Sequence, residues 1–294
     1  EFGKAIAPLP FASTILAAEA IKRAGSPAQK NKYLPKIAEG QLIGTVALFD
    51  AGQRTAFAAP HTTAVNGVIS GLKSPVADLE VADFVVFSAR AGSHDAIGLY
   101  IFDLLNSGVE ISALEGLDLV RAHAQLSLKN AAVEPLGEAH DGVDHIKALM
   151  DLSAVLTAFE QLGGAEAAME MALKYAQERF AFGRAIGGNQ AIKHKLADMF
   201  VKNQLARSHA YYGAWALNRD APELPRAAAG ARLAASEAYD FAAQECVEIH
   251  GGIGFTWESD CQFYYRRARL LSQSLGPKSI WVDRLVDQLR GRNT

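Results

Sequence analysis

The spacing of hydrophobic positions changes twice along the chain. In residues 1–41, two stretches, FASTILAAEAIKRAG and SPAQKNKYLPKIAEG, have apolar residues at helical intervals. Residues 42–143 contain short β-prone runs separated by Gly, Asp, Asn and Ser. In residues 144–294 the helical spacing returns. This order predicts an α+β chain in three parts: the end of an N-terminal helical domain, a β-barrel domain and a C-terminal four-helix bundle.

The first part has clear signals for helix ends. Ser26 followed by Pro27 is typical of an N-cap with proline at the first helical position, and Gly25 is typical of the end of the preceding helix. Two helices of this length bury too little apolar surface to form a core alone. We therefore expect them to be the end of a helical domain, most of which is absent from this sequence.

The middle part has the signals of an antiparallel β domain. Asn66-Gly67 lies between two β-prone runs and is the strongest short-range indication of a hairpin. Four further runs follow, namely ADFVVFSARAG, DAIGLYIFDL, GVEISAL and AQLSLKNAAVEPL. No helical pattern separates these runs, so the region favours an antiparallel barrel or sandwich over a doubly wound parallel sheet.

The last part predicts long amphipathic helices. Apolar residues recur at intervals of three and four and form one stripe, at Leu152, Val155, Leu156, Phe159, Leu162, Met169 and Ala172. Further long segments lie at about 187–218, 224–250 and 259–290, each bounded by Gly or Pro. Four long helices with short connections indicate a four-helix bundle.

Composition narrows the classes of function. A formal net charge of -3 argues against nucleic acid as a partner. No apolar run approaches the roughly 20 residues of a membrane-spanning helix, so we expect no membrane insertion. The two cysteines, Cys246 and Cys261, predict neither a disulfide framework nor a zinc site, and the histidines show no metal-ligand spacing. We expect reduced thiols, no bound metal and a cytoplasmic location.

Two motifs in the helical part invite a functional interpretation. The stretch YAQERFAFGRAIGGNQ places Arg179 ahead of Phe182-Gly183 and of Gln190 at the start of the next helix. By itself this pattern is typical of a helix C-cap with Gly183 in the left-handed conformation. The stretch EIHGGIGF brings three glycines into four positions, although a glycine costs about 1 kcal/mol inside a helix. No strand precedes it, so it is not a dinucleotide-fold glycine motif.

In combination, these motifs resemble the acyl-CoA dehydrogenase family. R-x-x-F-G followed by N-Q stands ahead of I-H-G-G-x-G-F, and both lie in a predicted bundle behind an antiparallel β region. Other family-like stretches are YLPKIAEGQLIGTVAL, VNGVISGLKSPVADLEVADFVVFSAR, GVEISAL and YYRRAR. The resemblance covers essentially the whole chain. Each motif is weakly specific alone, but the ordered set is strongly specific.

The resemblance implies FAD-dependent α,β-dehydrogenation of an acyl-CoA thioester, with electrons passing to an electron-transfer flavoprotein. It also implies a homo- or hetero-tetramer with a homologous subunit, because the family's flavin site spans a subunit interface. Arg179 would contact the diphosphate of a neighbouring subunit's FAD, with Phe182 and Gln190 near the adenine end. Gly251 and Gly252 would let the backbone approach the pyrophosphate closely.

One departure from the family pattern lies beside these glycines. Family members usually have a glutamine at the position of Glu248. An amide donates a hydrogen bond to a phosphate oxygen, whereas an ionised carboxylate repels it. Alternatively, Glu248 turns aside or pairs with a neighbouring arginine and leaves the flavin undisturbed.

The second departure concerns the catalytic base. Many members have a glutamate followed by Gly-Thr after the arginine-rich stretch, but this chain has Leu275 there, followed by Gly-Pro. Other members place the base on the first bundle helix, where this chain has Ser153. Glu160 lies two turns further, about 10 Å along the helix axis, and Asp151 points to the other side. Neither carboxylate is a convincing substitute.

The β region departs as well. Many members carry a Thr-Glu-Pro-Gly-x-Gly-Ser loop that holds the flavin ring, whereas residues 46–59 here read VALFDAGQRTAFAA. Only Asp50-Ala51-Gly52 is faintly similar, so the ring contacts cannot be assigned to residues of this chain.

Four hypotheses remain. The chain is the base-lacking subunit of a heteromeric acyl-CoA dehydrogenase, similar to subunits that act on steroid side-chain thioesters, or it is a self-sufficient dehydrogenase whose base is not identified. It is otherwise a scaffold subunit without flavin, or a flavin monooxygenase on the same fold. Loss of both base positions alongside intact R-x-x-F-G and H-G-G-x-G motifs favours the first hypothesis.

Overall fold

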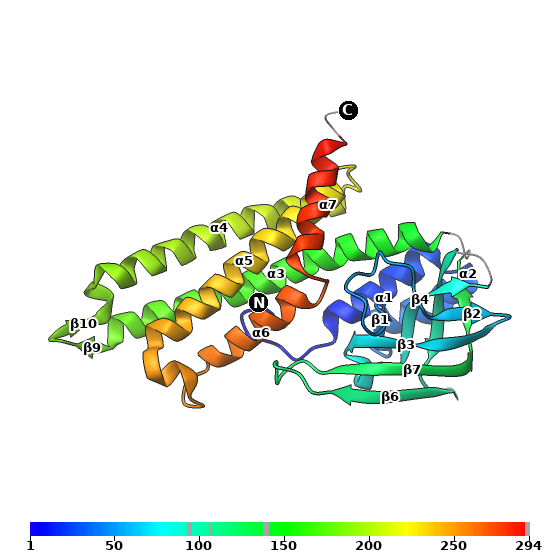
Figure 1. Cartoon of the computed structure of the whole chain (residues 1–294), viewed down its shortest axis with the longest axis horizontal. Helices are drawn as coiled ribbons and strands as arrows, with labels where there is room; N and C mark the ends of the chain where they lie inside the picture. Colours follow the sequence, from blue (N-terminus) through cyan, green and yellow to red (C-terminus); the bar gives the residue numbers. More distant parts are fainter. Residues whose placement is uncertain (93–95, 106–107, 138–140, 292–294) are drawn as a thin grey trace. The chain divides into compact units, whose positions relative to one another are not determined.

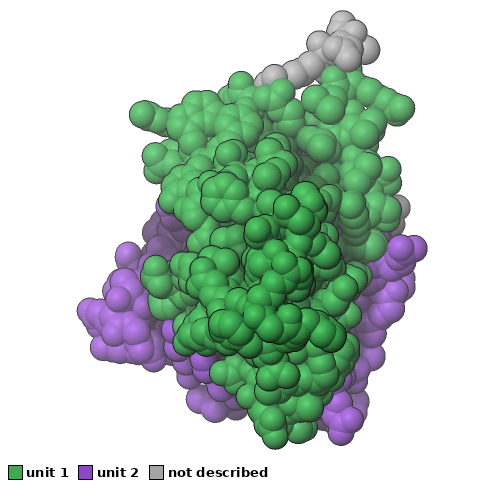
Figure 2. All heavy atoms as spheres, turned by 90° about the vertical axis from the view of Figure 1, so that its left-hand side faces the viewer, with its two compact units in different colours: residues 1–7, 117–120, 154–294 green, residues 8–116, 121–153 purple. Residues whose placement is uncertain are grey.

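The computed structural model describes residues 1–92, 96–105, 108–137 and 141–291. The chain divides into two compact units (Figure 2). The helical unit comprises Glu1–Ala7, Leu117–Val120 and Ala154–Thr294. The β unit comprises Pro8–Gly116 and Arg121–Ser153.

The β unit begins with the two predicted short helices. They are α1 (Phe11–Ala24) and α2 (Pro27–Ala38). The Ser26 side chain accepts a hydrogen bond from the Gln29 backbone N–H, and the Gln29 side chain accepts one from the Ser26 N–H. This capping box satisfies two N–H groups that have no partner within the helix, so the predicted helix start is confirmed.

The β unit contains one eight-stranded sheet (Figure 1). Its strands are β1 (Gly44–Ala47), β2 (Thr63–Val65), β3 (Val68–Ala77), β4 (Phe84–Ala91), β5 (Ile97–Asp103), β6 (Val109–Leu114), β7 (His123–Ala132) and β8 (Glu134–Leu136). The order is β6-β7-β3-β2-β4-β5-β8, and β1 pairs with β4. The sheet is mixed rather than wholly antiparallel, because β4 runs parallel to β1 and β2. These strands are not joined to β4 by hairpin turns, so no turn imposes opposite directions on them.

The turn at Asn66-Gly67 confirms the predicted hairpin. Val65 pairs with Val68 across it, and the two turn residues have φ values of 51° and 75°. Two central residues with positive φ define the type I′ turn, whose twist matches that of the flanking strands. This hairpin sets the register of β2 and β3.

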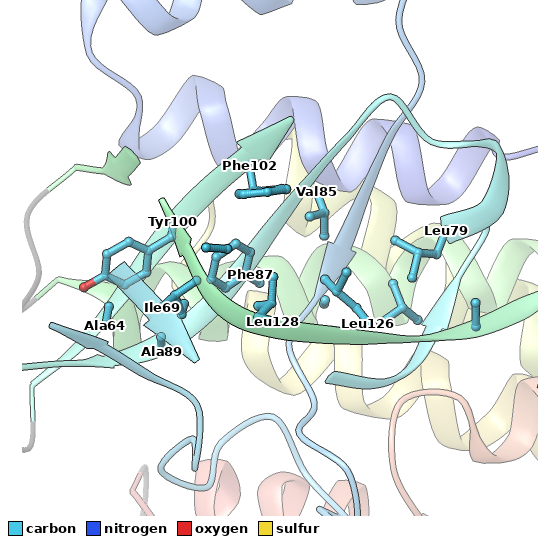
Figure 3. Close-up of a cluster of buried hydrophobic side chains, with 14 residues drawn as sticks. Ala64, Ile69, Leu79, Val85, Phe87, Ala89, Tyr100, Phe102, Leu126 and Leu128 are labelled. Carbon is cyan, nitrogen blue, oxygen red and sulfur yellow. The ribbon is translucent and has the colours of Figure 1, made fainter. Parts of the chain in front are cut away.

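The sheet packs on an apolar cluster (Figure 3). Most of β4 is buried, including Phe87, and the first half of β7 alternates between partly exposed and buried positions, with Leu126 and Leu128 buried. This alternation places every second side chain of β7 on the core face. Ile69 of β3 completes the centre of the cluster.

The helical unit contains the last part of α3 and the four helices that follow it. They are α3 (Gly142–Glu178), of which residues up to Ser153 belong to the β unit, then α4 (Gln190–Asn218), α5 (Leu224–His250), α6 (Cys261–Gln273) and α7 (Lys278–Arg290). The segment expected as a single helix at 259–290 is two helices. Gly276 has a φ of 89° and Pro277 follows it, a pair that ends one helix and prevents its continuation.

Small residues let the helices of this unit approach closely. One buried cluster combines Leu162 of α3 with alanines of α3, α4 and α5. Gly164 of α3 faces Tyr239 of α5, where a Cβ atom would lie 2.3 Å from the ring. Among the described residues, no helix combines the length and apolar character needed to cross a membrane.

Candidate functional site

One end of the helical unit brings the two sequence motifs together. The ring of Tyr175, in the last turn of α3, stacks on His250 at the end of α5, with 4.3 Å between ring centroids. Lys195 of α4 forms an ion pair with Glu248 of α5 at 2.8 Å. The R-x-x-F-G and H-G-G segments are therefore anchored to the same end of the bundle.

Arg179 follows directly after α3. Its backbone N–H donates to Tyr175 O at 2.8 Å, and its carbonyl accepts from the Ile186 N–H at 2.9 Å. The residue is exposed. The backbone is thus held on both sides while the guanidinium faces solvent.

Phe182 and Gly183 form a hairpin turn, so the interpretation as a helix C-cap is wrong, although Gly183 has the expected left-handed conformation, with a φ of 81°. They join β9 (Phe180–Ala181) to β10 (Arg184–Ala185), and α3 ends earlier, at Glu178. Phe182 has a φ of 52° and a fully exposed side chain. A bulky residue with positive φ is strained, and here no intramolecular burial offsets that strain.

Gln190 is the first residue of α4 and is exposed. The preceding residue, Asn189, does not cap the helix with its side chain, because its amide oxygen accepts from Arg184 instead. The first N–H groups of α4 are therefore without a side-chain cap.

The three glycines of H-G-G-x-G occupy a 3₁₀ turn, Gly251–Phe255, and each has a different environment. Gly251 has a φ of 64°, which favours glycine. Gly254 is buried, and a Cβ atom there would lie 2.6 Å from Val247 O. Gly252 has neither constraint: it is exposed, without positive φ, and a Cβ would meet nothing within 4 Å. Backbone geometry and packing explain Gly251 and Gly254 but not Gly252.

Glu248 pairs with a lysine rather than the arginine considered from the sequence. Its side chain is 60% exposed, and Lys195 also contacts Glu245. Burial lowers the pKa of Lys195, but its hydrogen bonds to Glu245 and Glu248 outweigh that effect and raise the pKa overall. The charge of Lys195, shared between Glu245 and Glu248, therefore offsets part of the negative charge next to the glycine turn.

The two positions of the family base hold no carboxylate. Leu275 lies between α6 and α7, where its carbonyl accepts from Trp281 Nε1 at 3.0 Å. Ser153 is buried in α3. A hydrocarbon and an unactivated hydroxyl cannot accept an α-proton from a thioester.

Glu160 has a structural partner that sequence reasoning missed. Arg267 of the YYRRAR stretch is buried and donates to Glu160 Oε1 at 2.9 Å and to Asp118. Burial lowers the pKa of Arg267, but the hydrogen bonds and charges of both carboxylates outweigh that effect and raise it overall. Glu160 is therefore the counter-ion of a buried arginine.

The other carboxylate considered from the sequence, Asp151, is buried in the β unit.

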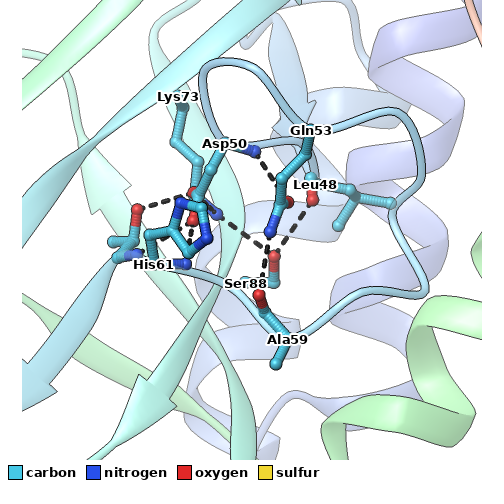
Figure 4. A network of polar contacts seen from close by, with 8 residues as sticks. Leu48, Asp50, Gln53, Ala59, His61, Lys73 and Ser88 are labelled. Carbon is cyan, nitrogen blue, oxygen red and sulfur yellow. Dashed lines mark hydrogen bonds and ion pairs between the residues drawn. The ribbon is translucent and has the colours of Figure 1, made fainter.

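The β-unit segment at the position of the family's flavin loop is closed by an ion pair (Figure 4). Lys73 Nζ lies 2.6 Å from Asp50 Oδ1, and both side chains are almost completely inaccessible. The Asp50 carboxylate also accepts from Thr62 N at 2.9 Å, from Thr62 Oγ1 at 2.7 Å and from the His61 N–H. Burial lowers the pKa of Lys73 to about 8, although the charge of Asp50 raises it. For Asp50, burial raises the pKa, but the Lys73 charge and these hydrogen bonds lower it overall.

Comparison with known proteins identifies the family. Two family descriptions match the chain: "Acyl-CoA dehydrogenase, C-terminal domain" at residues 140–289 and "Acyl-CoA dehydrogenase, N-terminal domain" at residues 1–41. The chain is 32% identical over 285 residues to the acyl-CoA dehydrogenase IpdE2 of Mycolicibacterium smegmatis, which covers 97% of this chain and 75% of IpdE2.

Solved structures of acyl-CoA dehydrogenases also match this chain. A variant of the steroid ACAD Tcur3481-Tcur3483 matches with a TM-score of 0.89 and 29% identity, over 100% of this chain and 80% of that one. The ChsE4-ChsE5 complex from Mycobacterium tuberculosis matches with a TM-score of 0.88 and 26% identity, over 98% and 78%. The predicted fold class is thereby confirmed. This chain belongs to the acyl-CoA dehydrogenase family, whose members are oxidoreductases that act on CH–CH groups.

Proposed function

We propose that this chain is the base-lacking subunit of a heteromeric, FAD-dependent acyl-CoA dehydrogenase. The observation that carries the proposal is the contrast between two sets of positions. Both base positions, Leu275 and Ser153, lack a carboxylate, whereas Arg179 and Gly252 present an exposed charge and an open backbone surface at one end of the bundle.

The missing base requires a second subunit. Removal of the α-proton of an acyl-CoA needs a carboxylate within hydrogen-bond reach of Cα. The nearest substitute on α3, Glu160, already neutralises Arg267, and its release would leave a buried arginine with one counter-ion fewer. A homologous partner subunit with an intact glutamate supplies the base in this scheme.

The residues of the bundle end fit a dinucleotide cofactor. Arg179 offers a charged donor to a diphosphate, and the exposed Gly252, with open space where a Cβ would lie, allows close approach of a phosphate to the backbone. The Gly251 N–H already donates to Glu248 O, so Gly251 contributes its open surface, and Phe182 and Gln190 are exposed. Lys195 reduces the repulsion that Glu248 would exert on a phosphate. FAD held by these residues would supply the acceptor for a hydride from the substrate β-carbon. The proposed final electron acceptor is an electron-transfer flavoprotein.

The relatives support an assembly with a homologous partner. ChsE4 and ChsE5 form a complex, and Tcur3481-Tcur3483 is a steroid ACAD. By analogy, the proposed substrate is an acyl-CoA thioester with a bulky, steroid-type acyl group.

The first test compares the purified chain alone with the chain co-expressed with a glutamate-bearing homologue. The expected result is flavin absorbance at about 370 and about 450 nm that acyl-CoA bleaches only in the co-expressed sample. Bleaching by the chain alone would contradict the need for a partner base. Absence of flavin from both samples would contradict the cofactor assignment.

The second test removes Arg179 in the co-expressed complex. Arg179→Ala should lower FAD affinity at least about tenfold, because a hydrogen bond to a charged group contributes about 1.5–3 kcal/mol. The matched control is Lys174→Ala, which removes an exposed positive charge one turn earlier on α3. Equal FAD content in both variants would show that Arg179 does not contribute to the proposed site.

A further inference from the structure

The only two cysteines of the chain lie together at the two ends of the glycine turn. Cys246 is in the last turn of α5, and Cys261 is the first residue of α6. Both are buried, and their sulfur atoms lie within 4.8 Å of each other and of one ring nitrogen of His250. Sequence reasoning missed this cluster. Of the histidines considered in the sequence analysis, His94 and His140 lie outside the described residues.

The surroundings of the two sulfurs differ. Ser259 Oγ donates to Cys261 Sγ at 3.1 Å, and Cys261 lies at the N-terminus of α6, where the helix dipole favours negative charge. The hydrogen bond from Cys246, followed by that from Ser259, lowers the pKa of Cys261, and the bond between the two cysteines raises the pKa of Cys246. The Cys261 S–H donates to Gly254 O at 3.4 Å, and the donors around this sulfur stabilise the thiolate that forms when the proton is lost.

We propose that Cys246 and Cys261 are a peroxide-reactive dithiol that closes to a disulfide across the glycine turn. The Cys261 thiolate attacks one oxygen of hydrogen peroxide, the O–O bond breaks, and the leaving hydroxide takes up a proton as water. Cys246 sulfur then bonds to the sulfenic sulfur of Cys261, and the displaced hydroxide takes the Cys246 proton to form a second water. Two electrons pass from the sulfur pair to the peroxide.

The same three side chains fit a soft metal cation less well. His250 Nδ1 lies 2.7 Å from Cys246 O and 3.8 Å from Cys246 Sγ. At 2.7 Å from a carbonyl oxygen, Nδ1 carries a proton and donates it, so this nitrogen has no lone pair for a metal beside the sulfur. The histidine anchors the end of α5, and the two sulfurs remain available to each other.

The size of the oxidant follows from the cover over the sulfurs. Both sulfurs are buried, and the Cys261 S–H donates to Gly254 O at 3.4 Å, in the turn next to the exposed side chains of Phe255 (81%) and Trp257 (70%). A small uncharged peroxide passes such a cover more easily than a bulky disulfide. Closure would join Cys246 to Cys261 covalently and tie both ends of the turn. This inference does not depend on the proposed dehydrogenase function.

The test treats the purified chain with hydrogen peroxide and measures free thiols, intact mass and cysteine-containing peptides. The expected result is simultaneous loss of both thiols, a monomer lighter by two hydrogen atoms, a linked peptide pair, and recovery on reduction with dithiothreitol. Retention of both thiols, or an intermolecular disulfide, would overturn the proposal. One equivalent of tightly bound zinc in the purified chain would also overturn it and identify a metal site.

Two variants separate the roles of the cysteines. Cys246→Ser should leave Cys261 as a sulfenic acid that dimedone traps, whereas Cys261→Ser should slow the oxidation of Cys246 at least tenfold. Equal reactivity of the two variants would contradict Cys261 as the attacking sulfur. If a variant fails to fold, the peptide map of the peroxide-treated chain without substitutions still shows whether the disulfide forms.

Discussion

Two segments at which the family resemblance predicts flavin contacts differ in how their polar groups are satisfied. The glycine turn of the helical unit, Gly251–Phe255, has open space over Gly252 and a largely exposed Phe255. The β-unit segment between Asp50 and Thr62 is closed by its own hydrogen bonds and by the buried Lys73 (Figure 4). The first segment offers groups to another molecule, and the second satisfies its groups internally.

The difference shows where each segment's stability comes from. Loss of one member of a buried, hydrogen-bonded ion pair lowers the free energy of unfolding strongly, because the remaining charge is neither paired nor hydrated. The exposed positions of the glycine turn contribute little to the free energy of unfolding, so changes there act on binding, whereas its buried Gly254 is a packing position. Substitutions at the buried ion pair should therefore lower stability, whereas substitutions at the exposed turn positions should lower cofactor binding.

The largest effect is expected for Asp50→Ala. This change leaves the ammonium of Lys73 buried with the hydroxyl of Ser88 at 3.3 Å, and it should lower the free energy of unfolding by about 3–5 kcal/mol. Chemical denaturation followed by circular dichroism measures the loss. In the double variant Asp50→Ala with Lys73→Met, much of the stability should return, since no unpaired charge remains. A double variant as unstable as Asp50→Ala would show that the ion pair is not the cause.

An intermediate effect is expected for Gly254→Ala. Its Cβ would lie 2.6 Å from Val247 O, so the turn must shift, at a cost of about 1–3 kcal/mol. The matched control is Gly252→Ala, which should change stability by less than about 0.5 kcal/mol yet reduce the FAD content of the co-expressed complex. Equal thermal stability of the two variants would contradict the distinction between a packing glycine and a binding glycine.

A smaller effect of opposite sign is expected for Phe182→Asn. Asparagine tolerates positive φ, and Asn-Gly is the preferred type I′ pair, so the variant should be more stable by about 1 kcal/mol as an isolated chain. The same change should weaken assembly with the partner or retention of FAD. Thermal denaturation and analytical size exclusion of the complex measure the two effects. A stabilised variant with unchanged assembly and FAD content would mean that Phe182 has no role in binding.

The smallest effect on stability is expected for Glu248→Gln. Its ion pair with Lys195 is 60% exposed on the glutamate side, so the free energy of unfolding should change by less than about 0.5 kcal/mol. FAD retention in the complex should rise, because an amide donates to phosphate and carries no charge. Glu258→Gln is the control, as an exposed glutamate just beyond the same turn. A fall in FAD content would show that the Lys195 pair supports the site.

Features that depend on a few neighbouring residues were predictable from the sequence. The capping box at Ser26 and the type I′ turn at Asn66-Gly67 are set by local hydrogen bonds and by φ preferences. The break at Gly276 was missed although its signal is local, because helical apolar spacing continues on both sides. The hairpin at Phe182 was missed because phenylalanine is an unusual residue at positive φ.

Pairings between distant segments were not predictable from one sequence. Arg267 and Asp118 are 149 positions apart, and the ion pair of Lys73 with Asp50 depends on the folded sheet. The two cysteines have no motif spacing and meet only because α5 and α6 turn back around the glycines. For the candidate site, the motifs predicted a set of residues, but Lys195 as the partner of Glu248 required the packing of α4 on α5.

The pairing of Asp118 with Arg267 has a consequence for how the chain can be divided. Residues Leu117–Val120 belong to the helical unit, although the chain on both sides of them belongs to the β unit. The backbone therefore passes between the units four times, at 7–8, 116–117, 120–121 and 153–154. A single protease cut in any of these connections leaves the units joined by the other three. Neither unit corresponds to one continuous gene segment, so their exchange between homologues by simple recombination would disrupt both.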